Sequence, residues 1–81
     1  MRSYKIYAKA SCGYCTKLVE ALLNKKISFC VEFLDGMPDR LEEKKNFYNQ
    51  QTVPIVILRE NGQETLIGGC TETLQRLEKE Q

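Results

Sequence analysis

Cys12 and Cys15 are separated by two residues, a spacing at which one sulfur can reach the other. A thiolate attacks disulfides whereas a thiol does not, so a redox cysteine needs a pKa below the pH around it. Cys12 directly precedes a predicted helix, whose unpaired N–H groups and dipole favour a negative charge, and Lys9 is near enough in sequence to add to this effect. We therefore expect Cys12 to attack disulfides and Cys15, one turn further in and less accessible, to resolve the product.

Other uses of this pair are a structural disulfide, half of a zinc site, or two ordinary core cysteines. A four-residue loop gives a disulfide little entropic advantage in the unfolded chain. The sequence has no His and no second Cys-x-x-Cys to complete a zinc tetrad, so no zinc site is predicted. Redox chemistry is the interpretation we favour. Cys30, in the middle of an apolar segment, is predicted to be a buried small hydrophobic residue rather than a reactive thiol.

The elements that must position the pair begin with a strand, a helix and a strand. Residues 3–8 alternate with the period of a strand and end just before the cysteines. In residues 13–25 the apolar side chains follow the spacing of an amphipathic helix, at Cys15, Leu18, Val19, Leu22 and Leu23. Residues 27–34 are rich in β-branched and aromatic types, which predicts a strand covered on both sheet faces. The two strands should therefore run parallel with a right-handed crossover.

The second half begins with a turn at DGMPD and a predicted helix over residues 39–50, held mainly by Leu41, Phe47 and Tyr48. Two apolar runs then flank an Asn-Gly pair, which predicts an antiparallel hairpin because Asn-Gly supplies the positive φ angles of tight primed turns.

A final short helix is predicted to start near Thr71, which would act as its N-cap, and to bury Leu74 and Leu77. The resulting order, β-α-β-α-β-β-α, is that of the minimal thioredoxin fold. It is an α/β fold with a four-stranded mixed sheet flanked by three helices.

Composition limits the partners. With 81 residues the chain has room for one domain, 1–81, and its 42% apolar and 28% charged residues are typical of soluble globular proteins. No apolar run reaches the ~18 to 20 residues of a membrane span, and the first residues do not resemble a secretory leader, so we expect no membrane association and a cytoplasmic location. A net charge of +1, without a basic stripe interleaved with aromatics, argues against nucleic acid.

Three short blocks connect the chain with a known family: YAKASCGYC at 7–15, TVP at 52–54 and GGCTE at 68–72. In this order and spacing they resemble the glutaredoxins, over essentially the whole length of the chain. The chain departs from the usual pattern in having Gly13 where proline is common and Glu72 where aspartate is common.

The resemblance implies that glutathione binds beside Cys12. Lys9 and Gln51 match positions that hold the glycine-end carboxylate, although an arginine is common in place of Gln51. Pro54 matches the cis-proline of the fold, and the Val53 backbone would then pair with the cysteine part of glutathione.

At the other end of the site, Gly69 permits close backbone approach, and the amides of Cys70 and Thr71 would meet the γ-glutamyl carboxylate. Glu72 would accept from the ammonium group. Without the other blocks, GGCTE would favour a turn and an N-cap that bind nothing. Cys70 has two open interpretations, a partly exposed third thiol open to glutathionylation or a residue packed under the last helix. Tyr14 either stacks beside the tripeptide or shields the helix start.

The expected activity is glutathione-dependent reduction of glutathione mixed disulfides and protein disulfides, by a monomer whose partners are glutathione and glutathionylated or disulfide-containing proteins. Three alternatives stay open. One is a glutaredoxin-like redoxin recharged by thioredoxin reductase. Another, by resemblance to members that lack the proline, is a [2Fe-2S] carrier in which Cys12 and glutathione hold a cluster between two protomers. The third is a binding module without an activated thiol.

Overall fold

The computed structural model describes residues 2–79. The elements in chain order are β1 (Arg2–Ala8), α1 (Gly13–Asn24), β2 (Phe29–Phe33), α2 (Pro38–Tyr48), β3 (Ile55–Glu60), β4 (Gln63–Gly68) and α3 (Cys70–Lys79). The sheet has the strand order β2-β1-β3-β4, with β1 parallel to β2 and the other pairs antiparallel. The predicted mixed sheet with three helices is confirmed. In the part of the chain described, no helix has the length and apolar character needed to cross a membrane.

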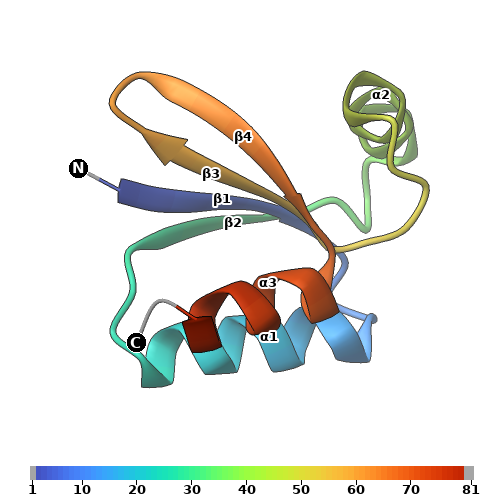
Figure 1. Ribbon diagram of the computed structural model, residues 1–81. Coiled ribbons are helices and arrows are strands. Elements are labelled where there is room, and N and C mark those ends of the chain that lie inside the picture. The colour runs from blue at the N-terminus through green and yellow to red at the C-terminus, as the bar shows by residue number, and fades with distance from the viewer. Residues whose placement is uncertain (1, 80–81) are drawn as a thin grey trace.

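One face of the sheet is covered by α1 and α3, which lie side by side beneath it (Figure 1). The alternation predicted for residues 3–8 places Tyr4, Ile6 and Ala8 on this face. They form the main core with apolar residues of both helices and of β3, namely Cys15, Leu18, Leu22, Val56, Leu58, Cys70 and Leu77. The packing fixes the direction of α1, so that its first turn lies where β1 ends.

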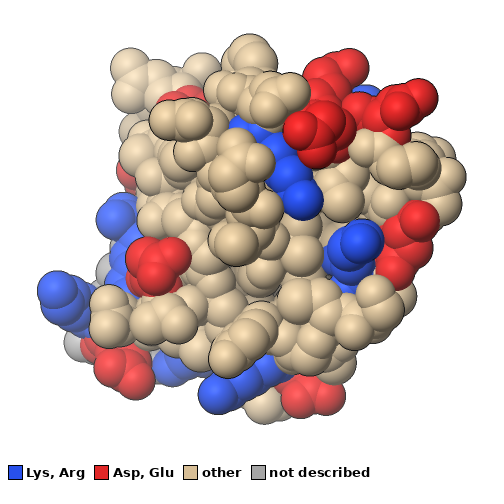
Figure 2. Space-filling model, turned by 90° about the vertical axis from the view of Figure 1, so that its right-hand side faces the viewer, with Lys and Arg blue, Asp and Glu red and all other residues tan. Residues whose placement is uncertain are grey.

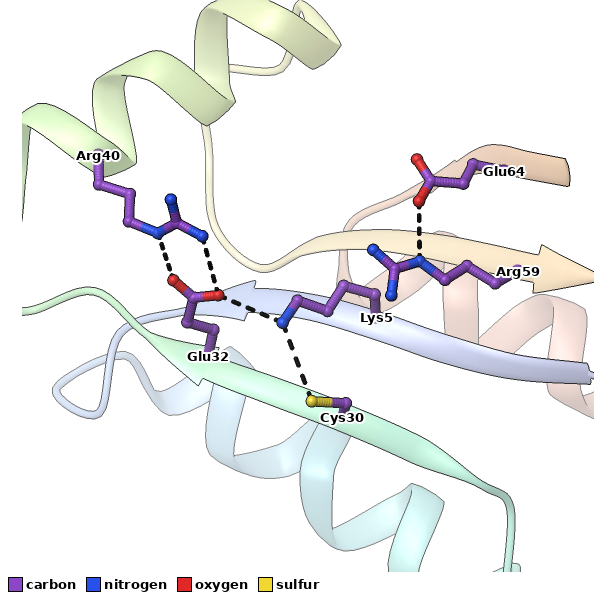
Figure 3. A network of polar contacts seen from close by, with 6 residues as sticks. All are labelled: Lys5, Cys30, Glu32, Arg40, Arg59 and Glu64. Atoms are coloured by element: carbon purple, nitrogen blue, oxygen red, sulfur yellow. Dashed lines mark hydrogen bonds and ion pairs between the residues drawn. The ribbon is translucent and has the colours of Figure 1, made fainter. Parts of the chain in front are cut away.

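The other face is covered only in part, because α2 lies above the end at which β1 finishes (Figure 1). A smaller core forms there from Tyr7, Leu34, Leu41, Ile55 and Ile57. Further along, the face carries a polar network in which the Lys5 ammonium lies 3.2 Å from Glu32 Oε1 and 3.8 Å from Cys30 Sγ (Figure 3). Arg40 of α2 binds both oxygens of Glu32, and these contacts, led by the Arg40 hydrogen bond, lower the pKa of Glu32 to about 2.

The sequence prediction was wrong about β2. It is an edge strand that packs on the main core through Phe29 and Val31 on one face and is open on the other, where Cys30 is exposed rather than buried. The side chain of Cys30 belongs to the face that α2 leaves open, beside Lys5. Apolar composition predicted the strand, but it could not predict which strand lies at the edge.

Two other side chains predicted to pack in the core are exposed. Leu23 is 60% exposed at the end of α1, and Phe47 is 74% exposed because α2 faces the core through Leu41 and Tyr48. The Phe47 ring packs edge-on against the Tyr48 ring, with centroids 4.8 Å apart.

The hairpin prediction is confirmed, since Asn61 and Gly62 both have positive φ angles, 55° and 79°. The start of α3 differs from its prediction. The helix begins at Cys70, so Thr71 lies within the first turn and Gly69 is the residue that precedes it. Leu77 is buried as expected, whereas Leu74 is half-buried.

Candidate active site

Cys12 is the N-cap residue of α1, with extended backbone angles of φ −92° and ψ 119°. Its N–H donates to the Lys9 carbonyl at 3.1 Å, and its own carbonyl accepts the Thr16 N–H at 3.2 Å. No side chain of residues 2–79 caps this helix by a hydrogen bond, and its first turn contains no acidic residue. The first N–H groups of α1 are therefore left to the cysteine sulfur, as the sequence led us to expect.

The two cysteines of the pair have opposite electrostatic environments. Burial alone would raise the pKa of the half-buried Cys12 thiol, but hydrogen bonds from the Cys15 side chain and backbone and from the Tyr14 backbone, with the charge of Lys9, bring that pKa below its usual value. Cys15 is fully buried, and this burial is the main reason why its pKa is raised to about 12. At neutral pH Cys12 is thus the better nucleophile of the two, while Cys15 stays protonated and donates towards it.

The loop that leads into α1 is held by a carboxylate from another part of the chain. Asp35, just after β2, accepts hydrogen bonds from the Ala10 N–H at 2.7 Å and from the Ser11 N–H and hydroxyl at 3.4 Å. The Ala10 bond contributes most to lowering the pKa of Asp35. Asp35 was not among the residues predicted to build the site, because nothing near it in sequence indicates this contact.

A groove of about 400 Å³ opens beside the cysteine. Seven of the residues predicted to bind glutathione line it, and Thr52, which was not predicted, joins them: Tyr14, Thr52, Val53, Pro54, Gly69, Cys70, Thr71 and Glu72. The Val53–Pro54 bond is cis, as the resemblance implied, and the Val53 carbonyl lies 4.0 Å from Cys12 Sγ. Figure 2 looks at this end of the molecule, where most of the visible surface is tan and a few blue basic and red acidic side chains lie among it.

The structure does not bring two of the predicted residues into the groove. Lys9 and Gln51 are absent from its lining, and Gln51 is exposed. Lys9 instead acts on the cysteine, since its charge helps to lower the pKa of Cys12.

The groove has two walls. Residues 52–54 form the first wall, and the start of α3, which is capped by the side chain of Glu72, forms the second. Glu72 Oε1 accepts the Gly69 N–H at 2.7 Å, and the Thr73 N–H and hydroxyl donate to the Gly69 carbonyl at 3.1 and 2.7 Å. Gly68 has a φ of 127°, and a Cβ there would lie 2.8 Å from Glu72 Oε1, so this position requires glycine. One oxygen of Glu72 is therefore engaged within the chain.

Cys70 is buried, with 6% of its surface exposed. Burial is the main cause that raises the pKa of its thiol, with smaller contributions from Cys12 and Glu72 and an opposing one from Lys17. Of the two interpretations left open, the packed residue agrees with this environment better than the exposed third thiol.

The two walls are joined by a residue that sequence reasoning missed. The side-chain amide of Gln50 donates to the carbonyls of Pro54 at 2.9 Å, Gly68 at 3.1 Å and Thr52 at 3.3 Å. A glutamine in a loop gives no signal of such contacts, because its partners lie in separate elements.

The donor set at the site does not fit a cluster held by one chain. Among residues 2–79 no group of three or more His, Cys, Asp or Glu side chains is placed to hold a metal ion. Of the site's thiols, Cys15 and Cys70 are buried and have raised pKa values. A [2Fe-2S] cluster would need ligands from outside the chain, as in the two-protomer arrangement that the resemblance suggests.

The sequence matches the family model for glutaredoxin over residues 5–63. No curated protein shows a significant sequence match. Among solved structures, glutaredoxin C1 of Populus tremula x tremuloides, crystallised in its holo form, is 26% identical, with a TM-score of 0.75 over 94% of this chain and 74% of the poplar chain. The dithiolic glutaredoxin 2-C-Grx1 of Trypanosoma brucei brucei is 29% identical, with a TM-score of 0.69 over 95% of this chain and 77% of the other.

A buckwheat glutaredoxin, solved as a complex with glutathione, is 21% identical, with a TM-score of 0.76 over 98% of this chain and 71% of the buckwheat chain. At that identity the likeness concerns the fold alone. Together these matches confirm the predicted thioredoxin-type fold.

Proposed function

Because this chain belongs to the glutaredoxin family of thiol–disulfide oxidoreductases, we propose that glutathione is its electron donor and that glutathione mixed disulfides are its main substrates. The observation that carries the proposal is the position of Cys12. Its sulfur lies at a helix start without a side-chain cap, has a lowered pKa, and lies beside a groove with peptide donors on one wall and the Val53 backbone on the other. The buckwheat relative, solved with glutathione, supports the choice of ligand.

In the proposed reaction, the Cys12 thiolate attacks the glutathione sulfur of a mixed disulfide. A new S–S bond joins Cys12 to glutathione, and the substrate thiolate leaves and takes up a proton. A second glutathione thiolate then attacks the bound glutathione sulfur. Oxidised glutathione leaves, and the Cys12 thiolate is restored.

Cys15 takes part when the substrate is a protein disulfide. Cys12 first forms a mixed disulfide with one substrate sulfur and releases the other as a thiolate. Cys15 then attacks Cys12 Sγ, so that a Cys12–Cys15 disulfide forms and the second substrate sulfur leaves. Cys15 is buried and enters this step as a thiol, so its proton passes to the departing thiolate as the bond forms.

Recognition of glutathione is proposed to use both walls. The Val53 backbone would pair with its cysteine part, as β-strands pair. The N–H groups of Cys70 and Thr71, in the first turn of α3, would meet the γ-glutamyl carboxylate. Glu72 would receive the ammonium on the oxygen that does not accept from Gly69, and Tyr14, 67% exposed, would lie against the tripeptide.

The test is turnover of hydroxyethyl disulfide with glutathione and glutathione reductase, in a Cys30→Ser background because Cys30 is an exposed thiol. Activity that survives Cys15→Ser but is lost in Cys12→Ser would support Cys12 as the attacking thiol and Cys15 as the resolving one. The proposal fails if wild type is inert with glutathione while thioredoxin reductase turns over its oxidised form.

A further inference from the structure

We propose that Gln50 sets the width of the groove by tying its two walls together, which makes it a positioning residue for glutathione. This inference rests on the proposed function. Gln50 does not line the groove. Its side chain contacts the backbone of both walls, the segment around Pro54 on one side and Gly68, next to the start of α3, on the other.

The amide nitrogen of Gln50 has two hydrogens and three carbonyl acceptors. The contacts with Pro54, at 2.9 Å, and Gly68, at 3.1 Å, are the shorter ones, and the Thr52 carbonyl at 3.3 Å shares the donor. All three acceptors are main-chain atoms, so the amide fixes backbone positions rather than other side chains. One planar group thus holds two backbone segments 14 residues apart.

The β3–β4 ladder does not supply this connection. Its regular pairing is interrupted between Val56 and Ile57, and its last pair is Val56 with Gly68. Pro54 lies beyond that pair and has no N–H to donate. The carbonyls of Pro54 and Gly68 accept from a donor outside the ladder, the side-chain amide of Gln50. The walls are close there, since a Cβ on Gly69 would lie 3.7 Å from the Pro54 carbonyl.

Gln50 can act as a fixed point because its own backbone is held by α2. The last residue of the helix is Tyr48, and the C-cap residue Asn49 has left-handed angles of φ 53° and ψ 44°. The next N–H, that of Gln50, returns to the Lys45 carbonyl at 2.9 Å. The side chain of Gln50 therefore starts from a fixed backbone position at the end of α2. Its hydrogen bonds hold both walls in place relative to α2 as well as to each other.

Gln50 should therefore affect the binding of glutathione in the groove but not the nucleophilicity of Cys12. The groups that lower the pKa of Cys12 are Cys15, Tyr14 and Lys9, and none of them is a partner of Gln50. Removing the amide should therefore loosen the groove without deactivating the thiol. A substrate that needs both walls is affected, whereas a small alkylating reagent that needs only the sulfur is not.

The experiment compares Gln50→Met, which keeps the length but removes the donor, with Gln75→Met, an exposed position on α3, as the matched control. Both are made in the Cys30→Ser background. For Gln50→Met we expect KM for a glutathionylated peptide to rise by about tenfold, while the iodoacetamide rate of Cys12 at pH 7 stays within about twofold. Gln75→Met should change neither quantity. Gln50→Lys restores a donor and should reverse part of the rise in KM.

Two results would overturn the inference. One is an unchanged KM in Gln50→Met. The other is a fall in the alkylation rate by as large a factor as the rise in KM, which would mean a general loss of structure. If the parent protein itself fails to turn over the glutathionylated peptide, the proposed function fails and this inference fails with it. If the parent protein turns over the peptide and Gln50→Met has the same KM, only the proposed role of Gln50 is contradicted.

Discussion

Two helices start beside the groove, and they use their first turns in opposite ways. At α1 the residue before the helix is Cys12, and the third helical residue is Cys15. At α3 the corresponding positions are Gly69 and Glu72. Glu72 folds back onto the Gly69 N–H, whereas no side chain caps α1. The same backbone geometry therefore serves a sulfur in one helix and an internal carboxylate in the other.

The difference shows what leaves a helix start available for chemistry. Unpaired N–H groups favour any nearby anion, and a carboxylate within the chain reaches them before a ligand does. In α1 the third position holds a buried thiol that donates toward Cys12 instead of competing with it. In α3 the Gly69 N–H is already used, so a ligand carboxylate would be left with the donors of Cys70 and Thr71.

The largest effect expected from this contrast concerns the two thiols of α1. In a Cys30→Ser background, Cys12→Ser should slow iodoacetamide labelling at pH 7 by a factor on the order of 1,000 or more. A thiol with a pKa near 12, like that of Cys15, is ionised only to about one part in 100,000 at that pH. Mass spectrometry of the labelled protein measures the rate, with Cys15→Ser, whose hydroxyl can still donate toward Cys12, as the matched variant that should keep its labelling. Rapid labelling of Cys12→Ser would contradict the assignment.

Gly13→Asp would give the first turn of α1 a carboxylate, as Glu72 does for α3. A Cβ on Gly13 would meet no atom within 4 Å, so Gly13→Asp fits without displacing a neighbour. A carboxylate beside the sulfur disfavours the thiolate, and we expect the pKa of Cys12 to rise by about one unit. The midpoint of the alkylation rate against pH should move to higher pH by the same amount. Gly13→Asn controls for shape without charge, and equal midpoints for the two variants would show that this position does not influence the sulfur.

Local sequence features were enough to predict the parts of the site that depend on neighbours in the chain. The spacing of Cys12 and Cys15 before an amphipathic helix placed the sulfur at the helix start. The Asn61-Gly62 pair fixed the hairpin, because both residues supply the positive φ angles it needs. The prediction failed where the outcome depended on which element lay nearby. Cys30 lies in an apolar run but on the open face of an edge strand.

The residues that hold the site together could not be predicted for the same reason. Asp35 binds backbone 24 and 25 residues away, and Gln50 reaches a carbonyl 18 residues away. Each is a common polar type in a loop, where the sequence pattern is the same whether the side chain faces solvent or another segment. Only the folded chain brings such groups to their acceptors or donors.

A smaller effect is expected at α3. Glu72→Ala removes the acceptor of the Gly69 N–H and should lower the free energy of unfolding by about 0.5 to 2 kcal/mol, the usual range for losing a helix cap. Glu72→Gln keeps an acceptor oxygen and should lose less. Urea unfolding of both variants, with Glu78→Ala on the same helix as an exposed control, measures the difference. If Glu72→Ala and Glu78→Ala were equally stable, the cap would not matter to the fold.

The smallest effect concerns the loop before α1. The carboxylate of Asp35, distant in sequence, holds this loop, just as the nearby carboxylate of Glu72 holds the residue before α3. The N–H of Ala10 is the main cause that lowers the pKa of Asp35 below its unfolded value. Stability from a depressed carboxyl pKa is fully present above the unfolded pKa, about 4, and is lost as pH falls through the lower folded pKa. Asp35→Asn should therefore lower the free energy of unfolding at pH 7. It should also make this free energy, measured by urea unfolding, depend less on pH below about 4.

The control for this last comparison is Glu20→Gln, an exposed carboxylate on α1 changed in the same way. Because Asp35 is exposed, solvent screens its hydrogen bonds, and the change should be slight beside those at Cys12 and Glu72. The alkylation rate of Cys12 gives a second measurement, since Ser11 is held by the same carboxylate next to the sulfur. Identical pH dependence in Asp35→Asn and the parent protein would mean that the loop before α1 keeps its shape without the carboxylate. The two helix starts would then differ in their support as well as in their use.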